Sequence, residues 1–140
     1  REKVEQLRAC RGDYRKLDKQ RKEKMLTWYQ ENKDKLDLKG SLVRQAFTMG
    51  LFGYMAIDPK DIQVIYEDKR KITWRSYNFC PFLEACKIMG LDTRVVCKQA
   101  DEDSIQNFIA CLSPKLKFSR SYVDIRPYAD YCEETIELVK

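Results

Sequence analysis

Alternating apolar and polar residues occupy two neighbouring stretches, 61–66 and 72–79, with five charged residues between them at 67–71. A period of two is typical of a β-strand with one buried face, and a short polar connector joins such strands in a hairpin. The chain of 140 residues has the length of one domain that buries its own core. The hairpin is therefore expected to lie in an antiparallel sheet packed with helices.

The N-terminal segment, residues 2–36, is rich in Glu, Lys, Arg, Gln and Leu, with no Pro and one Gly. This composition predicts a long helix, so residues 1–40 are expected to be a helical extension of an α+β domain at 41–140. Apolar residues recur every three or four positions on either side of the wholly polar stretch 18–24: Val4, Leu7, Cys10, Tyr14 and Leu17 before it, and Met25, Leu26, Trp28 and Tyr29 after it. The interruption favours a break or a solvent-exposed middle over a coiled coil.

A second helix is predicted over about 42–56. Gly40 ends the preceding segment, Ser41 provides an N-cap, and Pro59 follows the end of the helix. Apolar residues occupy most of the circumference of this helix. We therefore expect it to be buried.

The rest of the chain mixes helical and strand patterns. In chain order these are a helix opened by Pro81 and ended by Gly90, a short apolar run at 95–97 with a strand-like pattern, a helix from the acidic residues 101–103, and strands at 116–125 and 135–139. Together with the hairpin they predict an α+β fold with an antiparallel sheet.

The net charge of +5 comes from residues 1–39, which hold 13 basic and 8 acidic residues, whereas residues 40–140 hold 14 of each. Mixed charges on a helix usually form a solvated face, so nucleic-acid binding is not expected. There is no apolar run approaching the roughly 18 residues of a membrane helix, and no signal-peptide pattern. We expect a cytoplasmic protein without membrane contact, whose six cysteines are reduced.

Five of the six cysteines lie after residue 79, and the chain has no His. A Cys–His nucleophile pair and a mixed Cys/His zinc site are therefore excluded. Cys80 stands at the N-cap of the helix that Pro81 opens, where the helix dipole is expected to lower the pKa of the thiol. The alternative is a buried cap residue without reactivity, because free cysteines are often buried.

A series of short motifs runs through the second half of the chain: Cys80-Pro81-Phe82-Leu83-Glu84-Ala85, Gly90-Leu91, Cys97, Asp101 with Asp103, the run Pro114 to Arg120, and Asp130-Tyr131-Cys132. In this order and spacing they resemble the L-2-amino-thiazoline-4-carboxylic acid hydrolase family and, more distantly, the 4-vinyl reductase domain, a small-molecule-binding module. The resemblance covers about residues 61–140. It implies a domain with a pocket and hydrolytic opening of a cyclic thiazoline ring at a C–N bond. Residues 125–130 lack the Gly that is usual in the turn before the terminal Asp-x-Cys.

The resemblance also suggests roles for individual residues. Cys80 would be an activated thiol or ligand, Glu84 one helical turn later a general base, Cys97 and Cys132 pocket thiols, and Arg120 and Asp130 substrate-binding residues. Zn or Fe held by the three thiolates is a further hypothesis. Consecutive cysteines from Cys80 onward are 6, 11, 14 and 21 positions apart, which argues against a metal because thiolate sites usually contain a closely spaced pair. Solvated surface positions are the alternative for Glu84 and Arg120.

Two expectations concern partners. The apolar patches of residues 1–29 exceed what the remaining domain is expected to cover, which predicts a homodimer through the N-terminal helix, with a monomer as the alternative. The ligand is expected to be a small cyclic carboxylate. The alternative to a hydrolase is a non-catalytic thiol or metal sensor, or an interaction module.

Overall fold

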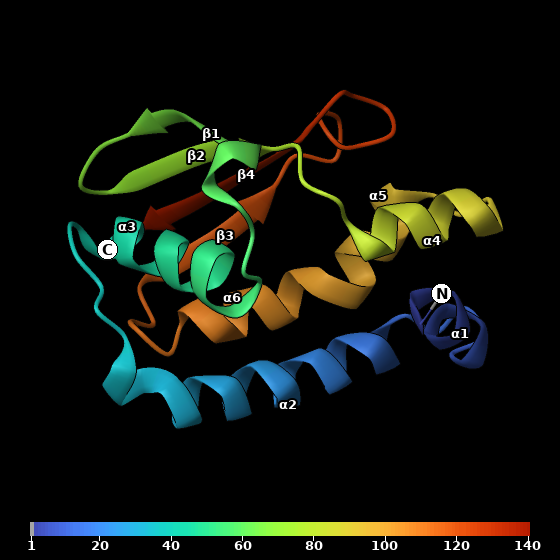
Figure 1. The fold of residues 1–140 in the computed structure, drawn as a ribbon, viewed down its shortest axis with the longest axis horizontal. Helices are drawn as coiled ribbons and strands as arrows, with labels where there is room; N and C mark the ends of the chain where they lie inside the picture. The colour runs from blue at the N-terminus through green and yellow to red at the C-terminus, as the bar shows by residue number, and fades with distance from the viewer. Residues whose placement is uncertain (1) are drawn as a thin grey trace.

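The computed structural model describes residues 2–140 and has an α+β architecture (Figure 1). The helices are α1 (Glu2–Ala9), α2 (Arg15–Asn32), α3 (Leu42–Thr48), α4 (Pro81–Met89), α5 (Thr93–Cys97) and α6 (Asp103–Ile109), with π-helical turns at η2 (Met49–Tyr54) and η4 (Lys98–Glu102). The strands are β1 (Ile62–Glu67), β2 (Lys71–Ser76), β3 (Leu116–Arg120) and β4 (Cys132–Leu138). No helix within residues 2–140 is long and apolar enough to cross a membrane.

The four strands form one antiparallel sheet in the order β1-β2-β4-β3. This confirms the predicted hairpin and the α+β class. The strand expected over 116–125 ends at Arg120, because Ser121 and the residues after it turn away into a loop that runs to Tyr131. The run at 95–97 lies in α5 instead of a strand, since the Asp92 side chain caps a helix there by accepting from the Arg94 amide.

Helices α3, α6 and α2 stack on one face of the sheet in two layers, and α1, α4 and α5 lie beyond one end of the sheet (Figure 1). α3 and α6 lie directly on the sheet, and α2 runs along the outside of α6. A buried contact joins the two layers, because the Ser104 amide in the first turn of α6 donates to Asp18 Oδ1 of α2 at 2.9 Å. A carboxylate at a helix N-terminus satisfies an amide that has no partner within the helix. Asp18 lies in the polar stretch that interrupts the apolar stripe and is buried, whereas Lys19, Gln20, Glu23 and Lys24 are exposed, so this stretch is exposed only in part.

The predicted long N-terminal helix is wrong in its first part, because the chain breaks after α1. Arg11 and Gly12 both have positive φ, 50° and 85°, a conformation that ends helices. The turn lets α1 lie against α4, where Val4 and Leu7 join a second core cluster with Phe82. Met25 of α2 belongs to the main core instead. Most of both N-terminal apolar patches is thus covered within the chain, although Leu26 stays exposed, and the dimer stays a prediction.

The second predicted helix starts at Ser41 as expected, with the Arg44 amide donating to the Ser41 hydroxyl. It continues beyond α3 through η2 and is buried at Val43, Phe47 and Met49. The inward face of the sheet begins as an apolar surface under this helix, where Ile72 pairs with Ile136. Toward the other end of the sheet the same face becomes polar, and this change sets the position of the site described below.

We predict that Met25→Ala destabilises the protein by about 2–5 kcal/mol, because Met25 is fully buried in the main core and truncation leaves a cavity. The matched control is the neighbouring Leu26→Ala, since Leu26 is 39% exposed and should cost less than about 1 kcal/mol. Urea unfolding of both variants measures the difference. Equal losses would contradict the burial of α2 against α6.

Candidate functional site

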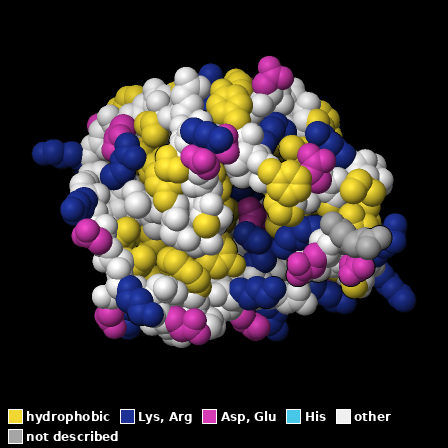
Figure 2. Space-filling model, in the orientation of Figure 1, with side chains coloured by type: hydrophobic (Ala, Val, Ile, Leu, Met, Phe, Trp, Pro, Cys, Tyr) yellow, Lys and Arg dark blue, Asp and Glu magenta, His cyan; other side chains and the backbone are white. Residues whose placement is uncertain are grey.

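A cavity of about 420 Å³ lies at the polar end of the sheet, between the strands, α2 and α4. Figure 2 shows this face of the molecule hollowed near its middle, with acidic and basic side chains at the bottom of the hollow. Seven charged side chains line it: Lys3, Arg21, Asp58, Asp101, Arg120, Arg126 and Glu134. Three thiols line it as well, those of Cys80, Cys97 and Cys132.

Strand register explains why these residues meet. β2 and β3 end at the cavity and β4 begins there, so Ser76 pairs with Cys132, and Arg120 pairs with Glu134. Residues two apart on a strand share a face. Cys132 and Glu134 therefore continue the inward face that Ile136 occupies in the core, and the sheet itself carries polar side chains into the cavity.

Arg120 is the centre of a buried ion cluster. Its Nη2 lies 2.6 Å from Glu134 Oε2 and 2.8 Å from Asp101 Oδ2, and Asp101 Oδ1 lies 2.6 Å from Arg21 Nη2. The Arg120 side chain is 7% exposed and that of Asp101 9%. Burial alone would raise the pKa of Asp101, but Arg21 and Arg120 hold it below its usual value. Likewise burial opposes the charge on Arg120, whereas Glu134 and Asp101 keep its pKa well above the usual range.

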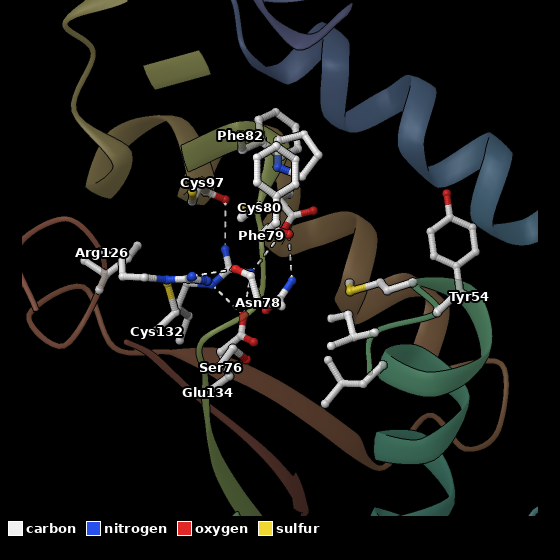
Figure 3. Close-up of a pocket in the computed structure, with 18 of the residues that line it drawn as sticks. Tyr54, Ser76, Asn78, Phe79, Cys80, Phe82, Cys97, Arg126, Cys132 and Glu134 are labelled. Carbon is white, nitrogen blue, oxygen red and sulfur yellow. Dashed lines mark hydrogen bonds and ion pairs between the residues drawn. The ribbon is translucent and has the colours of Figure 1, made fainter. Parts of the chain in front are cut away.

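Arg126 is held at the cavity wall by the loop between β3 and β4. Its Nε donates to Cys132 Sγ at 3.3 Å and its Nη1 to the Asn78 carbonyl at 2.6 Å, while its own carbonyl accepts from Thr93 Oγ1. In Figure 3 Cys97, Cys132 and Arg126 gather on one side of the view and Tyr54 lies at the other. These two thiols and the Arg126 guanidinium therefore share one part of the cavity wall.

The structure places Cys80 at the N-cap of α4, as predicted, but reverses the expected effect on its thiol. Burial raises the pKa of Cys80, and the side chain makes no capping hydrogen bond to the helix. Burial also raises the pKa of Cys97 far above that of a free thiol. Loss of hydration outweighs the helix dipole at Cys80. Burial therefore opposes the activation expected at Cys80, and the activated thiol stays a prediction.

Two predicted site residues lie outside the cavity. Glu84 is half-buried on α4 and its carboxylate lies 3.7 Å from Lys87 Nζ, one turn along the helix. Asp130 is exposed in the loop before β4. Cys80, Cys97, Arg120 and Cys132, by contrast, all line the cavity. Glu84 is therefore not placed to act as a base on a ligand bound there, and Asp130 is not placed to bind that ligand.

The charged cavity residues that sequence reasoning missed come from α1, α2, η4 and, for Glu134, β4. Lys3, Arg21 and Asp101 each line the cavity, yet Lys3 and Arg21 belong to a highly charged segment in which no single residue stands out. The wholly polar stretch 18–24 was the available signal, because a helix that loses its apolar stripe on an inward face needs polar partners there. Among residues 2–140 no group of three or more Cys, Asp or Glu side chains is arranged to hold a metal ion.

Comparisons of the chain with family models, with curated proteins and with solved structures find no match. Guanidinium groups bind carboxylates, aromatic and aliphatic walls bind small rings, and protonated thiols donate or accept weak hydrogen bonds. The arrangement suits recognition of a small anion better than nucleophilic attack.

We predict that Asp101→Asn lowers stability by about 3–5 kcal/mol at neutral pH, because it leaves two buried guanidiniums short of a counter-ion. The folded-state pKa of Asp101 lies below 3.8, so its stabilising effect is complete above that pH and is lost as the pH falls further. The gap between wild type and variant should narrow below pH 3.8, measured by urea unfolding. Asp130→Asn, at an exposed position, is the control and should change little.

Alkylation tests the reactivity of the Cys80 thiol. Iodoacetamide at pH 7 should modify Cys80 and Cys97 on the order of tenfold more slowly in the folded protein than in the urea-unfolded chain, because the thiolate is the reactive form. Peptide mass spectrometry measures each site. Faster labelling of Cys80 in the folded protein would restore the activated-thiol hypothesis.

Proposed function

We propose that the protein binds a small cyclic carboxylate of the thiazoline-carboxylate type in this cavity. The observation that carries the proposal is the cavity itself, which combines cations with apolar walls. Its volume of about 420 Å³ is in the range of small-molecule sites. The apolar part of the wall includes Leu51, Tyr54, Met55, Ile57 and Phe82.

The charge of the lining supports an anionic ligand. Four basic residues, Lys3, Arg21, Arg120 and Arg126, face three acidic ones, Asp58, Asp101 and Glu134. Asp58 is exposed and its side chain caps the short turn that follows it, so it sits at the rim. The inner wall therefore carries a net positive charge, which attracts a carboxylate. The resemblance to the thiazoline-carboxylate hydrolases supports the same chemical class independently of the charge.

Binding without turnover is the function that the geometry supports best. Ring opening needs a base for water, and Glu84 lies outside the cavity. Asp101 and Glu134 are within it, but both are engaged by Arg120, and a carboxylate with a lowered pKa such as Asp101 is a weak base. Hydrolysis of the C–N bond is implied by the resemblance, and it is a separate outcome that the binding experiment should also measure.

Isothermal titration calorimetry with 2-aminothiazoline-4-carboxylate tests the proposal. We expect saturable binding, and weaker binding of the matched 4-carboxamide, which keeps the ring and removes the negative charge. Mass spectrometry of the incubated ligand detects ring opening as the gain of one water. Absence of binding at millimolar concentration, or equal affinity for the carboxamide, would contradict the proposal.

A further inference from the structure

The basic residues of the cavity differ in how many of their N–H groups already have hydrogen-bond partners. Arg120 donates to Glu134, to Asp101 and to the Cys97 carbonyl, so most of its guanidinium N–H groups are engaged. Arg126 donates through Nε to Cys132 Sγ and through Nη1 to the Asn78 carbonyl, and it forms no salt bridge with the described carboxylates. Because most of the Arg120 N–H groups are engaged in this buried cluster, a ligand carboxylate would have to displace one of its partners. Arg120, the anchor that the sequence predicted, is therefore not the residue that meets the ligand's charge.

Arg21 and Lys3 retain free capacity. Arg21 meets Asp101 through Nη2, while its buried Nε has no hydrogen-bond partner among residues 2–140. The Lys3 ammonium donates to the neutral Gln6 side chain at 3.2 Å and forms no salt bridge with the described carboxylates. Both cations lie against the Phe82 ring, Lys3 Nζ at 4.6 Å and the Arg21 guanidinium carbon at 5.3 Å from its centre.

Two like charges that converge on one ring at the edge of a cavity are unfavourable unless an anion joins them. Burial lowers the pKa of Lys3, and the nearby Arg21 and Lys24 lower it further. Asp101 and Glu2 act in the opposite direction but do not restore the usual value. Lys3 therefore places a positive charge beside Phe82 that no described carboxylate pairs with, whereas Arg21 shares the Asp101 carboxylate with Arg120.

We propose that Lys3 and Arg21, beside Phe82, form an anion subsite that binds the carboxylate of the cavity's ligand. The proposal rests on the proposed function and assigns its charge recognition to α1 and α2 instead of the sheet. An anion bound there contacts both N-terminal helices. Ligand binding is therefore coupled to the docking of α1 on α4, and residues 2–9 should exchange amide hydrogens more slowly in the complex.

Variants of the two cations test the subsite. Lys3→Met should weaken binding of 2-aminothiazoline-4-carboxylate by about tenfold, the effect of one charge-assisted hydrogen bond. Arg21→Lys keeps a positive charge beside Asp101, which preserves the fold, and should weaken binding similarly. Both should reduce the preference for carboxylate over carboxamide. The control Lys19→Met, on an exposed position of α2, should bind as wild type does.

The pH dependence gives a second readout. Lys3 faces Arg21 and Lys24 from α2, Asp101 from η4, and Glu2 on its own helix. Because its pKa lies below 10.5, carboxylate affinity should fall as the pH rises through that lowered value. Lys3→Arg should keep the affinity at high pH, and Lys3→Met should abolish this dependence. A pH profile that is the same in all three proteins would overturn the role of Lys3.

Sulfate separates failure of the subsite from failure of the proposed function. The Lys3 Nζ and Arg21 Nε signals, followed by NMR, should shift saturably with sulfate whether or not the thiazoline binds. Unchanged carboxylate affinity in both Lys3→Met and Arg21→Lys overturns the subsite and leaves the proposed function intact. Saturable sulfate shifts without thiazoline binding overturn the function and support the subsite. Absence of both effects overturns both.

Discussion

The buried carboxylate of Asp101 holds together parts of the chain that otherwise share little. It pairs with Arg120 at the end of β3 and with Arg21 in the middle of α2, while Arg120 also binds Glu134 of β4. Two guanidiniums and two carboxylates balance, so the group can be buried without a net charge. Such clusters add little stability compared with an apolar core, but removing one member is strongly destabilising because it leaves a buried charge without a partner. Their contribution is to fix one arrangement of sheet and helices.

That cluster also marks the boundary between the core and the cavity. On the inward face of the sheet, Ile136 lies in the core, Glu134 in the cluster and Cys132 at the cavity. A fully apolar face would have continued the core and filled this space. The polar residues instead stop close packing at the end of the sheet, and α2 and α4 close the space from the sides (Figure 1). The cavity follows from a change of side-chain polarity along three strands.

Local rules predicted the elements whose causes are local. The hairpin, the Ser41 cap and the helix between Pro81 and Gly90 follow from alternation, capping and backbone preference, and the structure confirms them. The break after α1 could also be predicted from Gly12, but helix-favouring composition on both sides concealed it. The pairing of Arg21 with Asp101 could not be predicted from the sequence, because eighty positions separate the two residues and many other charged residues could pair with either of them. The sign of the shift at Cys80 depends on burial, which its cap position does not reveal.

These contacts make the N-terminal segment part of the folded domain. Taken alone, residues 1–40 have the composition of a solvated helical extension. In the structure they supply Asp18 to the first turn of α6 and Arg21 to the ion cluster, and α1 covers the Phe82 side of α4. A chain cut at residue 40 would leave the Asp101 carboxylate with one cation where it now has two, and would open the cavity on that side. The excess of positive charge in this segment therefore need not serve a large anionic partner, because part of it neutralises a carboxylate inside the protein.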